Sequence, residues 1–169
     1  MKKIALGFCA SITTVLLFTG CLKNNSDDFA SQTCTYDSCA VKAPAGEIQA
    51  VQQYLTDSSI TATQHCSGMF YNVVTAGNGL APTPCSYVTV KYVGKLANGT
   101  VFDKTADGAT YSQYLSNLIR GWVNALPYVK EGGKIRLYVP PSLGYGSQAV
   151  GSIPANSVLV FEVELIDVQ

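Results

Sequence analysis

A strict alternation near the carboxyl end is the feature that most constrains the fold of this 169-residue chain. From residue 159 to residue 165 every second side chain is large and apolar, whereas Glu162 and Glu164 stand between them. The apolar members are Leu159, Phe161, Val163 and Leu165. Successive side chains of a strand point to opposite faces of a sheet, so these four share one face. The pattern predicts a strand that lies on a hydrophobic core.

Similar signals occur earlier in the chain. Residues 69–74 and 134–139 alternate in the same way, and the second segment predicts one buried and one solvated face. Residues 87–96 run into Asn98-Gly99, the strongest short hairpin signal, and residues 100–102 form the returning strand. An antiparallel sheet is therefore expected.

Helical segments are short. Residues 121–126 can hold barely two turns before Pro127. Four or five antiparallel strands with one short central helix predict an α+β domain in which the sheet half-wraps the helix.

The amino terminus is typical of a targeting segment. Lys2 and Lys3 precede an apolar run from residue 4 to residue 18, which is too short to span a bilayer comfortably. The run ends in Leu-Phe-Thr-Gly-Cys at residues 17–21, which resembles the bacterial lipobox, with Phe18 where Leu is usual. This resemblance implies a signal peptide over residues 1–20 and a lipidated Cys21. The alternative is an ordinary secretory signal cut near Gly20.

Three further regions follow the predicted signal peptide. Residues 21–45 are polar without an apolar period and predict a flexible tether. Residues 46–65 form an amino-terminal extension that contains a short helix, and residues 66–169 form the folded domain. The extension is too short for a long dimerising arm, so a monomer is expected. Lipidation places the domain in the bacterial cell envelope, facing either the periplasm or the cell surface.

Four cysteines lie beyond the targeting segment, and in an oxidising compartment they predict two disulfides. They are Cys34, Cys39, Cys66 and Cys85. Three pairings are possible, and we favour Cys34 with Cys39 and Cys66 with Cys85. A zinc site that uses Cys34, Cys39, His65 and Cys66 is the competing interpretation, but the spacing matches no common finger. We therefore expect no metal or cofactor, and we expect His65 to be solvated.

Charge excludes one class of partner. Eleven basic residues balance eleven acidic ones, so the chain lacks the positive field that attracts phosphate backbones. We expect no nucleic-acid partner.

Five separated segments, in order and at fitting intervals, resemble the FKBP-type peptidyl-prolyl isomerases. They are Val90-Lys91-Tyr92-Val93-Gly94 with Leu96; Asn98-Gly99-Thr100-Val101-Phe102-Asp103; Leu118-Ile119-Arg120-Gly121-Trp122; Leu143-Gly144-Tyr145-Gly146; and Ile153-Pro154 with Val160-Phe161-Glu162-Val163-Glu164-Leu165. The resemblance covers residues 67–168. It implies an FKBP-like fold, with an antiparallel sheet half-wrapped around a helix.

The same resemblance implies a cleft that binds proline-containing polypeptides. Its catalytic residues are Asp103, Tyr145, Tyr92 and Phe102, and its substrate-binding residues are Leu118, Ile119, Trp122, Ile153 and Phe161. In this family pattern Trp122 forms the floor under the proline ring. The backbone N–H of Ile119 and the hydroxyl of Tyr145 meet substrate carbonyls, while Asp103 faces the rotating amide without transferring a proton.

Other interpretations stay open for these residues. Tyr92, Ile119, Trp122 and Phe161 could be plain core, and Asp103 could cap the turn at residues 105–106. The segment 104–110 lacks the arginine that often pairs with the cleft aspartate, and the nearby aromatic could be Tyr111 or missing. In the loop between Gly146 and Pro154, Ala149 and Ser152 stand where well-known family members have bulkier residues. We expect these changes to alter substrate preference and to weaken macrolide binding.

An isomerase for exported proteins is the favoured function, and a non-catalytic module that grips proline-containing segments is the alternative. A disulfide-exchange protein is excluded because no Cys-x-x-Cys pair is present.

Overall fold

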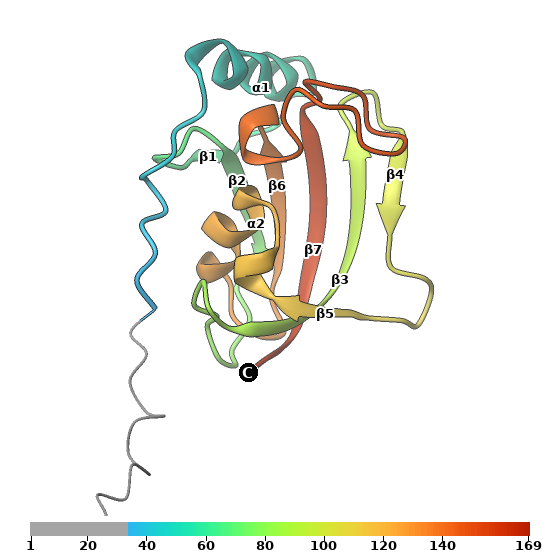
Figure 1. Cartoon of the computed structure of the whole chain (residues 1–169). Coiled ribbons are helices and arrows are strands. Elements are labelled where there is room, and N and C mark those ends of the chain that lie inside the picture. The colour runs from blue at the N-terminus through green and yellow to red at the C-terminus, as the bar shows by residue number, and fades with distance from the viewer. Residues whose placement is uncertain (1–33) are drawn as a thin grey trace, which may run out of the picture. The chain divides into compact units, whose positions relative to one another are not determined.

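The computed structural model describes residues 34–169, so the predicted signal peptide, Cys21 and most of the predicted tether lie outside the described residues. The described part is one compact unit built on an antiparallel sheet (Figure 1). The strands are β1 (Thr63–Gln64), β2 (Phe70–Thr75), β3 (Tyr87–Leu96), β4 (Val101–Lys104), β5 (Tyr111–Tyr114), β6 (Lys134–Val139) and β7 (Leu159–Val168). The helices are α1 (Ala45–Asp57) and α2 (Arg120–Ala125), and the short 3₁₀ turns are Leu115–Asn117, Leu126–Tyr128 and Pro141–Leu143.

The strand order is β1-β2-β6-β7-β3-β4, with β5 paired to the other half of β3. Strand β7 is central because it pairs with β6 on one side and with β3 on the other. The predicted hairpin at Asn98-Gly99 is confirmed, since Gly99 takes a φ of 86° and joins β3 to β4. Strand β5 was not expected, because residues 111–114 lack an apolar alternation.

The inner face of the sheet holds the main core. The alternate apolar residues of β6 and β7 all point there, together with Val88 and Val90 of β3, and helix α2 covers them (Figure 1). Each of the four predicted β7 core residues has an exposed fraction of 3% or less. Burial of such side chains stabilises a fold by about 1.5–3 kcal/mol each. The predicted α+β fold with a sheet around a short helix is confirmed.

Helix α1 covers part of the outer face, and the solvated face predicted for residues 134–139 is wrong at one position. Phe70, Tyr138 and Val160 lie opposite one another on β2, β6 and β7. Val51 and Leu55 of α1 pack on this row, and Tyr138 is only 1% exposed. Beyond the helix the outer face is wet and carries the Arg136–Glu162 ion pair at 2.9 Å.

All four cysteines form disulfides, as predicted, but the favoured pairing is wrong. Cys34 pairs with Cys85 and Cys39 with Cys66, at Cα separations of 5.9 Å and 5.5 Å. Cys66 and Cys85 precede β2 and β3, which are consecutive long strands in the sequence but are separated by β6 and β7 in the sheet. Proximity along the chain was therefore misleading.

Residues 34–43, which we call the strap, are held on the domain by these disulfides and by a hydrogen bond from Tyr36 Oη to Asn124 Oδ1 of α2, 2.7 Å. The backbone N–H of Ala43 also donates to the Ser67 carbonyl at 2.8 Å. A free tether therefore stays a prediction only for the residues before Cys34.

The expectation of a solvated His65 is wrong. Its side chain is 6% exposed and lies edge-on to Tyr128. The turn before β2 folds the ring inward, where its Nδ1 lies 2.8 Å from Ser67 Oγ. Cys39, His65 and Cys66 do come together, but their two sulfurs form a disulfide and Cys34 is bonded elsewhere. This arrangement contradicts the four-ligand zinc alternative. Among residues 34–169, no helix is long and apolar enough to cross a membrane.

Candidate active site

Helix α2 begins beside the candidate pocket. Ile119 is its N-cap residue, and the extended residue before it turns the chain into the helix. A side chain on Gly121 would meet Val139 of β6 at 2.7 Å, so glycine lets the helix approach the sheet closely. This approach places Trp122, which is 4% exposed, between the helix and the sheet.

Perpendicular aromatic rings surround Trp122. The indole lies edge-to-face with Tyr92 of β3 at 5.3 Å and with Phe161 of β7 at 5.4 Å between ring centroids. Phe102 of β4 meets Phe161 at 5.6 Å, also edge-to-face. Aromatic pairs prefer this geometry, and each adds about 0.5–1.5 kcal/mol beyond area burial. The rings therefore form a rigid box.

Glycine makes room for one of these rings. A side chain at Gly94 of β3 would meet the Phe102 ring at 2.7 Å and the Phe161 ring at 3.0 Å. Glycine is therefore required at this position of β3, because any side chain would displace the rings of the cleft.

The aromatic box opens into a pocket of about 230 Å³. Its lining residues are Tyr92, Asp103, Tyr111, Leu118, Ile119, Trp122, Tyr145 and Phe161. Asp103 and Tyr145 also line an adjoining hollow of about 240 Å³ that contains the other two predicted residues, Phe102 and Ile153. The structure thus brings the predicted set together in two hollows that share a rim.

Tyr111 was left open by sequence reasoning, and the structure places it in the pocket. It comes from the unexpected strand β5 and lies edge-on to Tyr92 at 6.1 Å. The segment Tyr-Ser-Gln-Tyr has no periodic pattern that predicts a strand. The only signal in the sequence was a weak one, namely an aromatic residue a few positions after Asp103.

Asp103 is held by a tyrosine. The hydroxyl of Tyr92 donates to its Oδ2 at 2.5 Å. The pKa of Tyr92 is raised, mainly by burial and to a smaller extent by this hydrogen bond. The hydroxyl therefore keeps its proton and continues to donate. The tyrosine holds the carboxylate in a segment that lacks the usual arginine. Within residues 34–169 the carboxylate makes no cap to the 105–106 turn.

Two hydrogen-bond donors at the pocket are free to bind a ligand. The Tyr145 side chain is 39% exposed, and within the described residues neither its hydroxyl nor the Ile119 backbone N–H has a hydrogen-bond partner. Burial and the nearby Asp103 carboxylate raise the pKa of Tyr145, so its hydroxyl is neutral and can donate. Both donors can bind carbonyl oxygens of a peptide.

A third hollow, of about 260 Å³, lies on the outer side of β3 and β7. It is lined by Lys91, Lys104, Lys134 and acidic residues, with Tyr92 as its sole aromatic contributor. Charged side chains line this hollow, whereas aromatic faces on which an apolar ring can stack line the other, so the aromatic pocket is the better candidate site.

The arrangement around Trp122 can bind and orient but offers no obvious nucleophile. Its polar groups are one carboxylate, phenolic hydroxyls, a backbone N–H and the buried indole N–H of Trp122, which has no partner within the described residues. These suit a reaction in which a peptide group changes conformation without bond cleavage.

Comparison with known proteins agrees with this geometry. Residues 79–166 match the family described as FKBP-type peptidyl-prolyl cis-trans isomerase. The chain is 46% identical over 104 residues to the Escherichia coli (strain K12) protein named FKBP-type peptidyl-prolyl cis-trans isomerase FkpA, which covers 61% of this chain and 38% of that protein. It is 42% identical over 118 residues to a probable FKBP-type isomerase of Haemophilus influenzae, covering 69% of this chain and 48% of that protein.

Solved structures show the same fold. The crystal structure of FkpA from Escherichia coli superposes with a TM-score of 0.67 at 39% identity, over 74% of this chain and 60% of that chain. A peptidyl-prolyl isomerase from Pseudomonas syringae gives a TM-score of 0.64 at 30% identity, over 76% of this chain and 98% of that chain.

The chain spans less than half the length of the curated relatives it matches. The family match nevertheless covers more than half of the present chain and includes both walls of the aromatic pocket. This chain therefore belongs to the FKBP-type peptidyl-prolyl cis-trans isomerase family.

Proposed function

We propose that the chain is a peptidyl-prolyl cis–trans isomerase that acts on X-Pro bonds of exported proteins. The observation that carries this proposal is the perpendicular aromatic box around Trp122, with free donors and a held carboxylate on its rim. Family membership supports the reaction class.

Rotation about an X-Pro bond is slow because the amide has partial double-bond character, with a barrier of about 18–20 kcal/mol. In the twisted amide the nitrogen and carbonyl lose resonance, and the group becomes less polar. An aromatic pocket binds this state better than the planar one. Preferential binding by about 5.5 kcal/mol accelerates the rotation about 10⁴-fold.

Each residue then has a defined task. The proline ring rests on Trp122, between Tyr92 and Phe161, while Leu118 closes the side of the pocket. Ile119 N–H and Tyr145 Oη donate to substrate carbonyls and orient the peptide. Asp103 supplies a negative field near the rotating carbonyl carbon, and Tyr92 keeps it in place.

The adjoining hollow accounts for substrate choice in this proposal. Its floor contains Phe102 and Ile153, and its rim contains the small residues Gly151 and Ser152. We propose that this hollow, which small residues leave wide, accepts large side chains of the residue before proline. We also propose that it contacts macrolide ligands poorly and therefore binds them weakly.

We further propose that a lipid on Cys21 holds a monomeric enzyme at the bacterial cell envelope, although this residue lies outside the described range. The lipobox resemblance at residues 17–21 supports the anchor. Expression of Cys21→Ala should shift the protein from the membrane fraction to the soluble fraction. Unchanged fractionation would count against lipidation.

Exchange spectroscopy on Leu-Pro and Ala-Pro peptides tests the catalytic proposal. At micromolar protein, the cis–trans exchange rate should rise in proportion to enzyme concentration. Peptide line broadening without faster exchange would instead indicate a non-catalytic binding module. Ser116→Ala, an exposed change outside the pocket, serves as the matched control and should retain the wild-type rate.

A further inference from the structure

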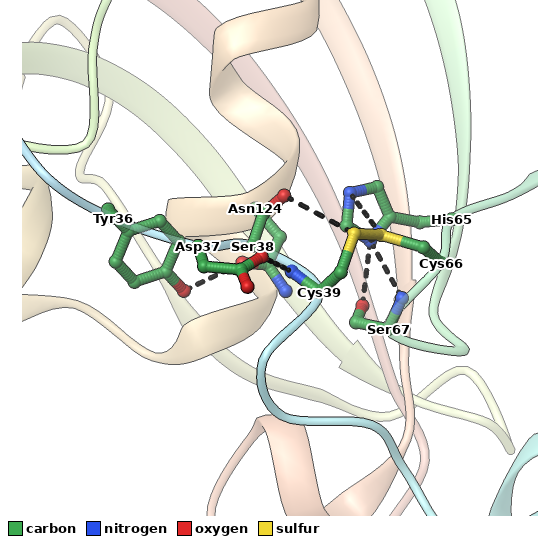
Figure 2. Close-up of a disulfide and its surroundings, with 8 residues drawn as sticks. All are labelled: Tyr36, Asp37, Ser38, Cys39, His65, Cys66, Ser67 and Asn124. Atoms are coloured by element: carbon green, nitrogen blue, oxygen red, sulfur yellow. Dashed lines mark hydrogen bonds between the residues drawn. A yellow bond between two sulfur atoms is a disulfide. The ribbon is translucent and has the colours of Figure 1, made fainter.

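The two disulfides differ in what surrounds their sulfurs. In Cys39–Cys66 both cysteines are exposed, and the bond joins the strap to the turn before β2 (Figure 2). In Cys34–Cys85 one cysteine is half-buried, and within residues 34–169 neither sulfur has a hydrogen-bonding neighbour. An attacking thiol can therefore reach Cys39–Cys66 more easily.

An imidazole lies against one sulfur of the exposed bond. Figure 2 shows His65 beside Cys66, whose Sγ is 3.6 Å from Nδ1 and 3.7 Å from Nε2. The sulfur of Cys39 lies 3.9 Å from the Ser38 hydroxyl, whereas a His65 ring nitrogen comes only within 4.8 Å of it. The two ends of one disulfide thus have unequal partners.

Ser67 sets the proton position on that imidazole. Its backbone N–H donates to Nδ1 at 3.1 Å, and its hydroxyl lies 2.8 Å from the same atom. Because Nδ1 accepts, we assign the proton of the neutral ring to Nε2. Burial lowers the pKa of His65, which favours the neutral ring.

Thiol–disulfide exchange is directional when one leaving thiolate is better stabilised than the other. A neutral imidazole whose Nε2–H faces a sulfur, as at 3.7 Å here, can donate to the thiolate that forms there and favours it. Charge should therefore develop on Cys66 when the bond opens. The Asp37 carboxylate accepts the Cys39 backbone N–H at 2.8 Å, so the nearest acidic group on this strap lies on the Cys39 side of the bond.

We propose that Cys39–Cys66 is a thiol–disulfide exchange site, at which a dithiol attacks Cys39 and Cys66 departs as a thiolate beside His65. The attacking thiolate forms a mixed disulfide with Cys39 as the Cys39–Cys66 bond breaks. The second thiol of the dithiol then displaces Cys39, and two cysteine thiols and one oxidised dithiol result. In this reaction the chain is the substrate of a dithiol reductant, which agrees with its lack of a Cys-x-x-Cys pair.

Opening this bond leaves the strap attached. Cys34–Cys85 still holds its beginning, and the Ala43–Ser67 hydrogen bond holds its end at 2.8 Å. The exchange is therefore local and reversible. In the reduced form the Nε2–H of His65 can donate to the Cys66 thiolate.

Timed reduction of the full chain with dithiothreitol, followed by alkylation and peptide mass mapping, tests the order of opening. Cys39–Cys66 should open about tenfold faster than Cys34–Cys85, which is an internal control in every sample. Equal rates, or earlier opening of Cys34–Cys85, would overturn the proposal.

Direction is tested with reduced glutathione, a monothiol that leaves its mass on the attacked residue. The adduct should reside on the peptide that contains Cys39, and an adduct mainly on Cys66 would contradict the assigned direction. His65→Gln should slow the opening of Cys39–Cys66 by about fivefold and leave Cys34–Cys85 unchanged. If that variant does not fold, Ser67→Ala, which removes the hydroxyl at Nδ1, provides the second test. Unchanged selectivity in the folded variant would refute the role of His65.

Discussion

The two faces of the sheet each carry a helix, yet only the inner one forms a pocket. Helix α1, with 13 residues, lays Val51 and Leu55 onto Phe70 and Tyr138 and fills the outer contact. Helix α2, with 6 residues, touches the sheet through Gly121 and Trp122 and ends before it covers the β3–β4 side. Aromatic rings that stand perpendicular there hold the uncovered space open. The short helix α2 therefore leaves a pocket beside it, whereas the longer helix α1 fills its contact with the sheet and forms core.

Removal of the pocket floor should have the largest effect. Trp122→Ala loses edge-to-face contacts to Tyr92 and Phe161, so we expect unfolding free energy to fall by about 3–5 kcal/mol. Isomerase kcat/KM should fall about 100-fold or more in the molecules that stay folded, because the proline ring has lost its support. Urea denaturation and exchange spectroscopy measure the two effects. Full activity would show that the floor is only core.

Truncation on the outer face should separate stability from activity. Leu55→Ala removes a contact with Phe70 and Tyr138, and the unfolding free energy should fall by about 2–5 kcal/mol. The folded fraction should keep wild-type kcat/KM, since α1 does not line the pocket. A matching loss of kcat/KM below the unfolding transition would show that the two faces are coupled.

The polar rim should show the opposite pattern. Asp103→Ala and Tyr145→Phe each remove a group to which the proposed mechanism gives a contact with substrate, so kcat/KM should fall about tenfold, equivalent to roughly 1.4 kcal/mol. The unfolding free energy of Tyr145→Phe should change by less than about 0.5 kcal/mol because this side chain is exposed, whereas Asp103→Ala should lose about 0.5–1.5 kcal/mol with the hydrogen bond from Tyr92. Glu131→Gln, remote from the pocket, is a matched control. Wild-type rates in both rim variants would refute the assigned roles.

A smaller, pH-dependent effect is expected at Tyr92. Its pKa is raised above the ordinary 10.0, so the folded state holds this proton more tightly than the unfolded state does. The resulting stabilisation is complete below about pH 10 and is lost as the pH rises towards the raised value. Wild-type protein should therefore lose more unfolding free energy than Tyr92→Phe between about pH 9 and about pH 11. Denaturation curves at both pH values check this, and parallel losses would contradict it.

Local pattern was enough to predict most of the sheet. The alternation in β7 and β6 depends on one buried face, and the Asn-Gly turn depends on a positive φ at Gly99, so both are visible within a few residues. Strand β5 was not predicted because its own residues do not alternate, and only pairing with β3 makes the segment a strand. Tyr111 therefore reached the candidate site only through tertiary structure.

Contacts between distant segments explain the wrong predictions. Tyr138 alternates with buried residues and is expected to be wet, but α1 returns to cover it. The disulfide pairing followed sequence order, whereas two strands separate β2 from β3. His65 is buried because the turn before β2 folds it against Tyr128, which lies more than 60 positions further along the chain.

The sequence by itself determined the strand faces, the hairpin, the presence of two disulfides and the family motifs, because each depends on residue type at short spacing. Tertiary structure alone decided which cysteines pair, which face α1 covers, how Tyr92 holds Asp103 and where the imidazole of His65 meets a disulfide. These depend on strand order and on the close approach of a short helix to a curved sheet. Such properties arise from packing between segments far apart in the chain, which local periodicity does not encode.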